Sequence, residues 1–311
     1  MLSGYKGAEA DIAQQVEREP RQSGVGVVTV VHNAGDELRV FVETLAAATE
    51  HPYELAIINT GSGTVKCAGA DILVDHPDGN VGYGNGINYG FDLLQEKMAG
   101  DGVSMEWLIV TNPDIEWSTL AIDKLIEAAE SEPDAGAIGP KLLNEDGSTY
   151  PSARAQPSLS VGVGHALFTK FWPNNPWSRQ YQHELSETEP TEVGWLSGAC
   201  LLLRAEAFKQ VDGFDKRYFM FFEDVDLGDR LLKAGWKNIY VPTVSVTHYQ
   251  GTSWKSKPTA MIRAHHDSAR LFLFDRWGAW WQAPIRLFVA IGLKVREHME
   301  VADANRRGFG D

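Results

Sequence analysis

Apolar and polar residues follow two alternating patterns along the first 140 positions. Short apolar runs rich in β-formers, typical of buried strands, occur at residues 25–31, 55–58, 72–74, 108–110 and 137–139. Between them, apolar residues recur every three or four positions, as they do from 38 to 45, which predicts amphipathic helices. This alternation predicts an α/β fold, with a mostly parallel central sheet and helices on both faces.

The pattern changes after residue 140. Residues 141–192 are rich in proline and polar residues and are predicted to be mainly loops. Later predicted elements are a strand at 194–204, helices at 205–211 and 223–234, short strands at 239–241 and 244–247, and helix after 258. The sequence therefore divides into a polar leader (1–23), a main domain (24–250) with two halves that meet near residue 140, and a helical C-terminal region (251–311).

Charge is unevenly distributed along the 311 residues. The net charge of −14 argues against a nucleic-acid-binding protein. Residues 251–311 hold ten Lys and Arg against six Asp and Glu (net +4), so the first 250 hold 18 against 36 (net −18). Four of the ten tryptophans also lie in this C-terminal region. A basic, Trp-rich end suggests contact with an anionic surface or a lipid phosphate; the alternative is packing on the acidic body.

The cysteines and the apolar stretches indicate a cytoplasmic protein. Cys67 and Cys200 have neither the number nor the spacing of a disulfide framework or a zinc site, and Cys200 lies in an apolar run. The N-terminus lacks the pattern of a signal peptide. The apolar stretch at 287–295 is too short to span a bilayer.

The stretch at 107–117 places a carboxylate at the end of a predicted central strand. The apolar run breaks before Pro113, because proline cannot donate to a ladder. Asp114 is thereby expected at the carboxyl end of the strand, where ligands bind in open α/β sheets. A carboxylate there suits a hard divalent cation, and the cation suits a diphosphate. The alternative is a solvated turn residue that caps the next helix.

Two adjacent carboxylates, Glu223 and Asp224, begin a predicted helix directly after four apolar residues. Interaction with the helix dipole is one explanation for acidic residues there. Crowding of two carboxylates at the edge of the core also raises one pKa and can create a general base. Asp226 lies four residues before Arg230 and is predicted to be its structural partner.

Other chemical motifs are weaker or absent. His248 follows a short predicted strand; it is either a packed histidine or, if the fold brings it beside Asp114, a metal ligand. The glycines at 82, 84 and 86 lack the dinucleotide spacing, since the sixth position from Gly82 is Ile87. The sequence has no Walker-type, GxSxG or HExxH motif, so oxidoreductase, kinase and hydrolase functions are disfavoured.

Six segments together with His248 resemble the inverting glycosyltransferases of family 2, which have the GT-A fold. The segments lie at 29–33, 59–62, 80–84, 112–114, 213–215 and 223–227. Each is short, but their order and spacing over residues 25–250 are specific. The resemblance implies that residues 24–140 form a nucleotide-binding half and residues 141–250 an acceptor and catalytic half.

The resemblance also implies roles in catalysis. Asp114 resembles the last acidic position of the family's DxD motif and would bind Mg²⁺ or Mn²⁺ on the donor diphosphate, with His248 as an additional metal ligand. The first motif position is Asn112 here, so the motif supplies one carboxylate. Asp224, beside Glu223, resembles the general base that deprotonates the acceptor hydroxyl for one in-line attack.

A set of nucleotide and sugar contacts follows from the same resemblance. Asn59 stands where many relatives have an Asp that binds the base; its amide can accept from thymine N3–H and also donate, so base selectivity is less defined. Arg154 is expected to meet a phosphate, while Trp195 and the backbone of Gly198 shape the sugar pocket. The full expected set is His32, Asn33, Asn59, Gly61, Ser62, Gly82, Tyr83, Asn112, Arg154, Trp195 and Gly198.

A closer likeness, at 150–154, 171–177, 193–198, 223–234 and the Trp-rich tail, is to actinobacterial rhamnosyltransferases of this family. It implies a dTDP-rhamnose donor and a polyprenyl-diphosphate-GlcNAc acceptor, in synthesis of the arabinogalactan linker at the inner face of the cell membrane. The tail resembles an interfacial anchor; the alternative is an apolar hairpin that makes a homodimer. Rival hypotheses are a family 2 enzyme with a UDP- or GDP-linked donor and a non-catalytic nucleotide-binding scaffold.

Overall fold

The computed structural model describes residues 23–32, 37–154, 186–249 and 258–306. Asn33, the segment 171–177 and nearly all of the predicted leader lie outside these described residues. The division into domains stays a prediction.

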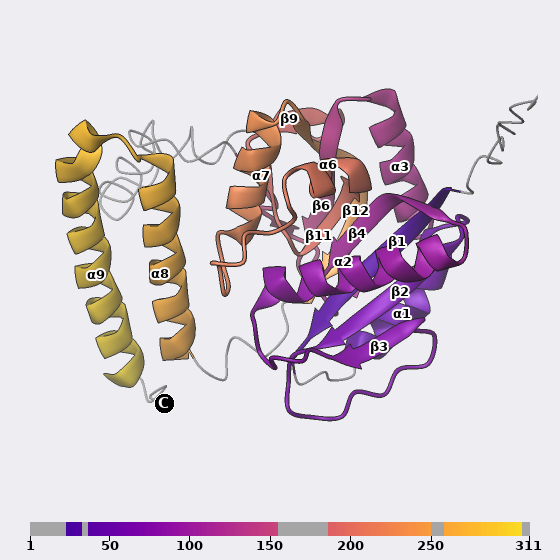
Figure 1. Ribbon diagram of the computed structural model, residues 1–311, viewed down its shortest axis with the longest axis horizontal. Coiled ribbons are helices and arrows are strands. Elements are labelled where there is room, and N and C mark those ends of the chain that lie inside the picture. Colours follow the sequence, from indigo (N-terminus) through magenta and orange to yellow (C-terminus); the bar gives the residue numbers. More distant parts are fainter. Residues whose placement is uncertain (1–22, 33–36, 155–185, 250–257, 307–311) are drawn as a thin grey trace, which may run out of the picture.

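A mixed sheet forms the centre of the molecule (Figure 1). Its strand order is β3 (Ile72–Asp75), β2 (Tyr53–Asn59), β1 (Ser23–Val31), β4 (Ser104–Thr111), β11 (Cys200–Arg204), β6 (Ala135–Leu143), β12 (Lys237–His248) and β5 (Ile115–Glu116). The first four strands are parallel, and β12 is parallel to β6, whereas β11 runs antiparallel to both of its neighbours. Short pairings are added by β7 (Thr149–Tyr150) on β6, β9 (Thr191–Val193) on β12, and β8 (Ala153–Arg154) on β10 (Trp195–Leu196).

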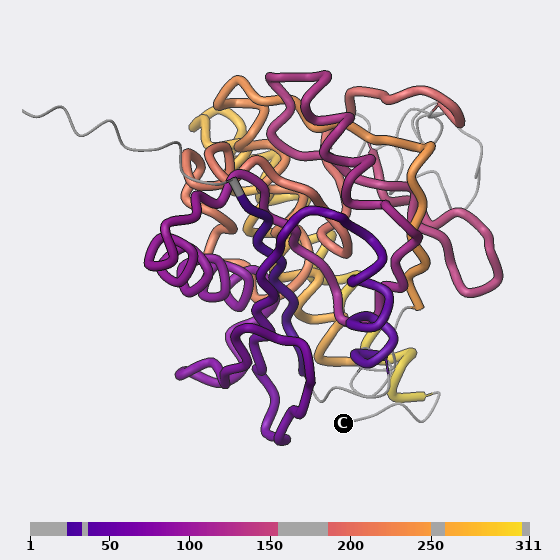
Figure 2. The backbone as a smooth tube through the Cα atoms, turned by 90° about the vertical axis from the view of Figure 1, so that its right-hand side faces the viewer, coloured from indigo at the N-terminus to yellow at the C-terminus, as the bar shows by residue number. Residues whose placement is uncertain are grey.

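Helices cover both faces of the sheet, because successive strand residues point to opposite sides. On β1, Val27 packs in an apolar cluster with α1 (Glu37–Ala48) and α3 (Ala121–Ser131). The next residue, Val28, packs in a second cluster with residues of three other helices, α2 (Tyr83–Gly100), α6 (Ala205–Gln210) and α7 (Glu223–Lys233). Figure 2 shows α1 and α2 on opposite sides of the N-terminal strands, so the predicted α/β layering is confirmed.

Three predicted strands were wrong in detail. The strands predicted at 239–241 and 244–247 are one strand, β12, because a shift in register between Val241 and Ser245 accommodates Pro242 without ending the strand. The strand predicted at 194–204 is two strands, β10 and β11. A turn separates them, in which the N–H of Cys200 approaches the carbonyl of Ser197 (3.4 Å). This turn carries Gly198 out of the sheet.

The helical C-terminal region forms a hairpin of α8 (Pro258–Arg276), the 3₁₀ turn η2 (Trp280–Gln282) and α9 (Ala283–Arg306). In Figure 1, α8 lies between α9 and α7. Phe272 of α8 packs in one apolar cluster with Tyr218 and Val225 of the main body. Among the described residues, none of the helices combines the length and the apolar character needed to cross a bilayer.

Candidate active site

Asp114 and His248, far apart in the sequence, come together at the ends of their strands. β4 ends at Thr111, and β5 then pairs with the end of β12, with Ile115 opposite His248. The Nε2 atom of His248 lies 3.3 Å from Oδ1 of Asp114 and 3.2 Å from Nδ2 of Asn112. Asp114 and His248 are each 8% exposed. The fold thus satisfies the condition under which His248 was expected to be a metal ligand.

The chemistry of the Asp114–His248 pair fits a divalent cation bound to a diphosphate. An imidazole nitrogen and a carboxylate oxygen at this distance attract each other through a shared proton or through a cation. Mg²⁺ often takes one or two protein ligands and completes its shell with water and substrate phosphates. No group of three or more His, Cys, Asp or Glu that could hold a metal ion occurs within the described ranges. Water and the oxygens of a bound substrate would complete the shell of a cation held by Asp114 and His248.

The turn before α7 holds two consecutive aromatic residues in the left-handed conformation. Phe221 and Phe222 have φ values of 67° and 65°, a region that bulky side chains rarely adopt. α7 begins at the next residue, and the N–H of Asp226 donates to the carbonyl of Phe222 at 2.8 Å. This strained turn places Glu223 and Asp224 in the first turn of the helix.

Gly82 allows the N-terminus of α2 to approach this turn. Its φ is 88°, and a Cβ atom there would lie 1.8 Å from the carbonyl oxygen of Phe219. The N–H of Tyr83 donates to the same carbonyl at 3.2 Å. Close backbone packing therefore explains the glycine at this position.

Glu223 and Asp224 differ in how the protein supports their charges. Burial, and then the charge of Asp224, raise the pKa of Glu223 to about 8. Burial also raises the pKa of Asp224, but N–H groups of Gly198 and Val225 donate to its two oxygens and, with nearby Arg154, oppose the shift. The structure therefore favours a proton on Glu223 and a negative charge on Asp224 at neutral pH.

Gly198 links the carboxylate pair to the other half of the site. Its N–H donates to Oδ2 of Asp224 at 3.1 Å, and its carbonyl accepts from the hydroxyl of Tyr83 at 2.6 Å. The carbonyl of the next residue, Ala199, accepts from the N–H of Asn112 at 2.9 Å. Hydrogen bonds at two successive residues thus connect Asp224 to Asn112, which contacts His248.

Arg154 and Trp195 lie on the same side of the site as Asp224. The two residues are paired with each other across β8 and β10. The guanidinium of Arg154 lies 5.8 Å from the centre of the Trp195 ring. The ring centre of Tyr150 lies 5.8 Å from that of His248. Burial, and then the charge of Asp224, raise the pKa of the Tyr150 hydroxyl. Tyr150 thus lies near both His248 and Asp224. It was not among the residues expected from the sequence, although it begins the recognised segment 150–154.

The polar residues at the ends of β1, β2 and β3 form a separate group. Asn59 is only 2% exposed; its Nδ2 donates to the carbonyl of Gly63 at 2.9 Å and to Oδ1 of Asp75 at 2.7 Å. Its Oδ1 accepts from the N–H of Gly61 at 3.0 Å. Asn59 therefore organises the turn after β2, whereas the exposed Asp75 offers a carboxylate at the same sheet edge. Asp75 was not expected from the sequence, but its place at the end of a predicted strand was an available signal.

Two further expected residues lie beside this turn. His32 follows β1, is exposed, and has its Nδ1 atom 3.3 Å from the carbonyl of Thr60. Ser62 is exposed within the turn itself. They are placed with Asn59 and Gly61, at the carboxyl ends of neighbouring parallel strands.

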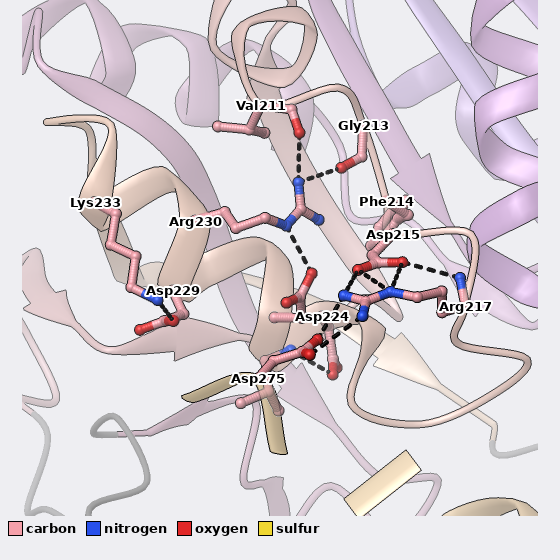
Figure 3. Close-up of polar contacts among 12 residues, drawn as sticks. Val211, Gly213, Phe214, Asp215, Arg217, Asp224, Asp229, Arg230, Lys233 and Asp275 are labelled. Carbon is pink, nitrogen blue, oxygen red and sulfur yellow. Dashed lines mark hydrogen bonds and ion pairs between the residues drawn. The ribbon is translucent and has the colours of Figure 1, made fainter. Parts of the chain in front are cut away.

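Arg230 ties α7 to the loop that precedes the site (Figure 3). Its guanidinium donates to Oδ2 of Asp226 at 2.7 Å and to the carbonyls of Val211 and Gly213 at 2.5 and 2.7 Å. The predicted partnership of Asp226 and Arg230 is confirmed. Asp226 is thereby occupied in holding the helix.

Comparison with known proteins adds a family and several relatives. The family model described as Glycosyl transferase family 2 matches residues 26–212 of the chain. The chain is 44% identical over 289 residues to the N-acetylglucosaminyl-diphospho-decaprenol L-rhamnosyltransferase of Mycobacterium tuberculosis H37Rv, covering 90% of this chain and 94% of that protein. It is 28% identical over 256 residues to the rhamnosyltransferase WbbL of Escherichia coli K12, covering 80% and 86%.

Two solved structures share the fold at low sequence identity. The mannosyltransferase PcManGT from Pyrobaculum calidifontis, in complex with GDP-Man and Mn²⁺, has a TM-score of 0.51 and 12% identity, covering 91% of this chain and 73% of that one. GalNAc-T7 with UDP, GalNAc and Mn²⁺ has a TM-score of 0.51 and 14% identity, covering 74% and 44%. These likenesses show the fold alone, and they confirm the GT-A fold expected from the sequence.

Proposed function

The chain belongs to glycosyltransferase family 2, and on this premise we propose that it transfers L-rhamnose from dTDP-L-rhamnose to a polyprenyl-diphosphate-linked GlcNAc. The 44% identity to the mycobacterial rhamnosyltransferase, over nearly the whole of both chains, supports the transfer of L-rhamnose and this acceptor, and dTDP as the nucleotide is part of the proposal. The observation that carries the chemistry is the path of contacts from Asp224 through Gly198 and Ala199 to Asn112, beside His248. This path supports a single site that holds both the general base, Asp224, and the donor diphosphate.

The proposed mechanism is one in-line displacement that inverts the anomeric carbon. Asp224 takes the proton from the acceptor hydroxyl while the oxygen of that hydroxyl attacks C1 of rhamnose. The bond from C1 to the dTDP oxygen breaks in the same step. Glu223 keeps its own proton at neutral pH, so a second negative charge does not crowd Asp224. Asp114 and His248 would hold Mg²⁺ or Mn²⁺, which supplies charge stabilisation for the departing diphosphate.

The donor and sugar contacts follow from the same placement. We assign binding of the nucleobase to the turn after β2. Asp75 lies at the edge of this turn, and Asn59 acts by holding the turn together. Arg154 would meet a phosphate of the donor or of the acceptor, a role supported by the effect of its charge on Asp224. Trp195 and Tyr150 would line a pocket for the sugar, between the nucleobase and the Asp114–His248 pair.

The buried amide of Asn59 favours one alternative, a family 2 enzyme that uses a UDP- or GDP-linked sugar. Since the amide is engaged in the turn, discrimination between bases rests on neighbouring groups such as Asp75. A thermal-shift panel with dTDP, UDP and GDP separates these donors, because the matching nucleotide raises the melting temperature most.

An activity assay tests the proposed reaction. The full chain is incubated with dTDP-L-rhamnose, Mn²⁺ and a soluble polyprenyl-diphosphate-GlcNAc analogue, with expected release of dTDP and formation of a rhamnosyl-GlcNAc lipid. Turnover with another nucleotide sugar, and none with dTDP-rhamnose, would refute the donor. Absence of turnover with every nucleotide sugar would support the scaffold hypothesis. Because the proposed acceptor is lipid-linked, we place the reaction at the inner face of the cell membrane.

A further inference from the structure

The C-terminal hairpin exposes a row of large apolar side chains on α9 and on the turn before it. We call the following six residues the hairpin apolar surface: Trp280, Trp281, Leu287, Phe288, Ile291 and Val295. Trp280 is 85% exposed and Phe288 is 73% exposed. Single exposed apolar residues are common, but helix positions three and four apart form one continuous stripe. A stripe of this kind indicates an interaction surface.

The opposite side of α9 already has partners. Glu297 is buried and accepts from Arg270 of α8 at 3.0 Å and from Lys294 at 2.8 Å. Glu300 lies 3.2 Å from Nε2 of His266 on α8. These contacts fix the rotation of α9, so the hairpin apolar surface points away from α8. Figure 1 shows α9 as the outer helix of the hairpin.

The charge around the hairpin apolar surface indicates which kind of partner it binds. The 21 residues at 276–296 contain four Lys or Arg and no Asp or Glu, in a chain of net charge −14. The guanidinium of Arg286 lies 5.5 Å from the ring centre of Phe274, so a cation and aromatic groups share the tip of the hairpin. Tryptophan and arginine side chains favour the boundary between water and the apolar interior of a bilayer. Three of the four cations pair with carboxylates outside the stretch: Arg276 with Asp229, Lys294 with Glu297 and Arg296 with Glu300. Arg286 donates to the backbone carbonyl of Trp277, and an anionic headgroup would give it a counter-charge.

We propose that the hairpin apolar surface docks on an anionic lipid bilayer, with Trp280, Trp281 and Phe288 entering the headgroup region. The proposal rests on the proposed function, because a polyprenyl-linked acceptor lies in a bilayer. A second copy of the chain fits less well, since a two-fold interface would bring together the same stretch, with its Arg286 guanidinium, from both copies. Because α8 packs on Tyr218 and Val225, docking would hold the main body near the lipid surface, with the two helices of the hairpin between them (Figure 1).

Vesicle co-sedimentation of the full chain, without donor or acceptor, tests the docking. Vesicles of phosphatidylcholine alone are compared with vesicles that also contain phosphatidylglycerol; we expect stronger, salt-sensitive binding to the anionic vesicles. The double variant Trp280→Ala, Phe288→Ala should bind about tenfold less. Arg39→Gln, which removes an exposed cation from α1 of the main body, is the control and should bind as the unaltered chain does.

Sedimentation velocity on the same samples separates a lipid surface from a second copy. Undiminished vesicle binding by the double variant, or binding that ignores anionic lipid, overturns the proposal. A dimer that the double variant converts to monomer, with no vesicle binding by the unaltered chain, also overturns it. Vesicle binding without rhamnosyl transfer refutes the proposed activity alone, and transfer to a soluble acceptor by a chain that ignores vesicles refutes the docking alone.

Discussion

Ser268 of α8 donates its hydroxyl hydrogen to the backbone carbonyl of Met220, 2.8 Å away. Met220 directly precedes the two left-handed phenylalanines, whose rings each lie 5.5 Å from the ring of His265 on the same helix. The C-terminal hairpin therefore contacts the strained turn from which α7 and its two carboxylates begin. This contact gives a helix outside the matched family segment, 26–212, a way to influence the geometry of the site.

We predict that Ser268→Ala lowers turnover and leaves donor affinity nearly unchanged. Loss of one hydrogen bond costs about 1 kcal/mol, which loosens the turn without unfolding the chain. Steady-state kinetics should show kcat reduced about fivefold, with an unchanged KM for dTDP-rhamnose. The control is Ser131→Ala, because Ser131 donates to the carbonyl of Glu127 in α3 at 3.0 Å. Equal effects of both substitutions on kcat would argue against a positioning role for Ser268.

We predict that Glu223 makes the folded protein less stable as the pH rises. Its folded pKa is about 8, above the usual 4.5, so between these values the folded state binds the proton more tightly than the unfolded state. The contribution of Glu223 to the free energy of unfolding is therefore present below about pH 4.5 and is lost as the pH rises through about 8. Thermal unfolding of Glu223→Gln, which cannot ionise, should show a melting-temperature advantage over the unaltered chain that grows with pH. An advantage that stays constant with pH would contradict this titration.

We predict that Asp114→Ala removes the metal dependence of donor binding. Titration calorimetry of the unaltered chain should show about tenfold tighter dTDP binding, or more, with Mn²⁺ than without it. The variant should bind dTDP equally weakly in both conditions, and His248→Ala should lose a large part of the enhancement. Asp146→Ala, on an exposed turn, is the control. Retention of the full Mn²⁺ enhancement by Asp114→Ala would remove Asp114 from the metal site.

The expected residues Asp114, Glu223 and Asp224 could be found from local sequence because each follows an apolar run that predicts its strand or helix. The position of His248 could be stated only conditionally. It depends on the pairing of β12 with β5 and on a bulge that carries β12 past Pro242, and neither is a local property of the chain.

The conformations that the sequence did not predict depend on tertiary contacts. Aromatic residues do not favour positive φ, so the left-handed Phe221 and Phe222 follow from their packing against α8. Asn59 matched a base-binding position in sequence, but its burial and its bonds to Gly63 and Asp75 became visible only in the folded turn.

The rate of rhamnosyl transfer by Asp224→Asn, measured together with dTDP affinity in Mn²⁺, tests the catalytic assignment most directly. We predict that transfer falls by about 10²- to 10⁴-fold while dTDP affinity is retained, because the substitution removes the proton acceptor without touching the metal pair. Glu223→Gln should keep most of the activity at neutral pH, since Glu223 is already protonated there. Transfer by Asp224→Asn at a rate close to that of the unaltered chain would contradict the assignment of Asp224 as the base.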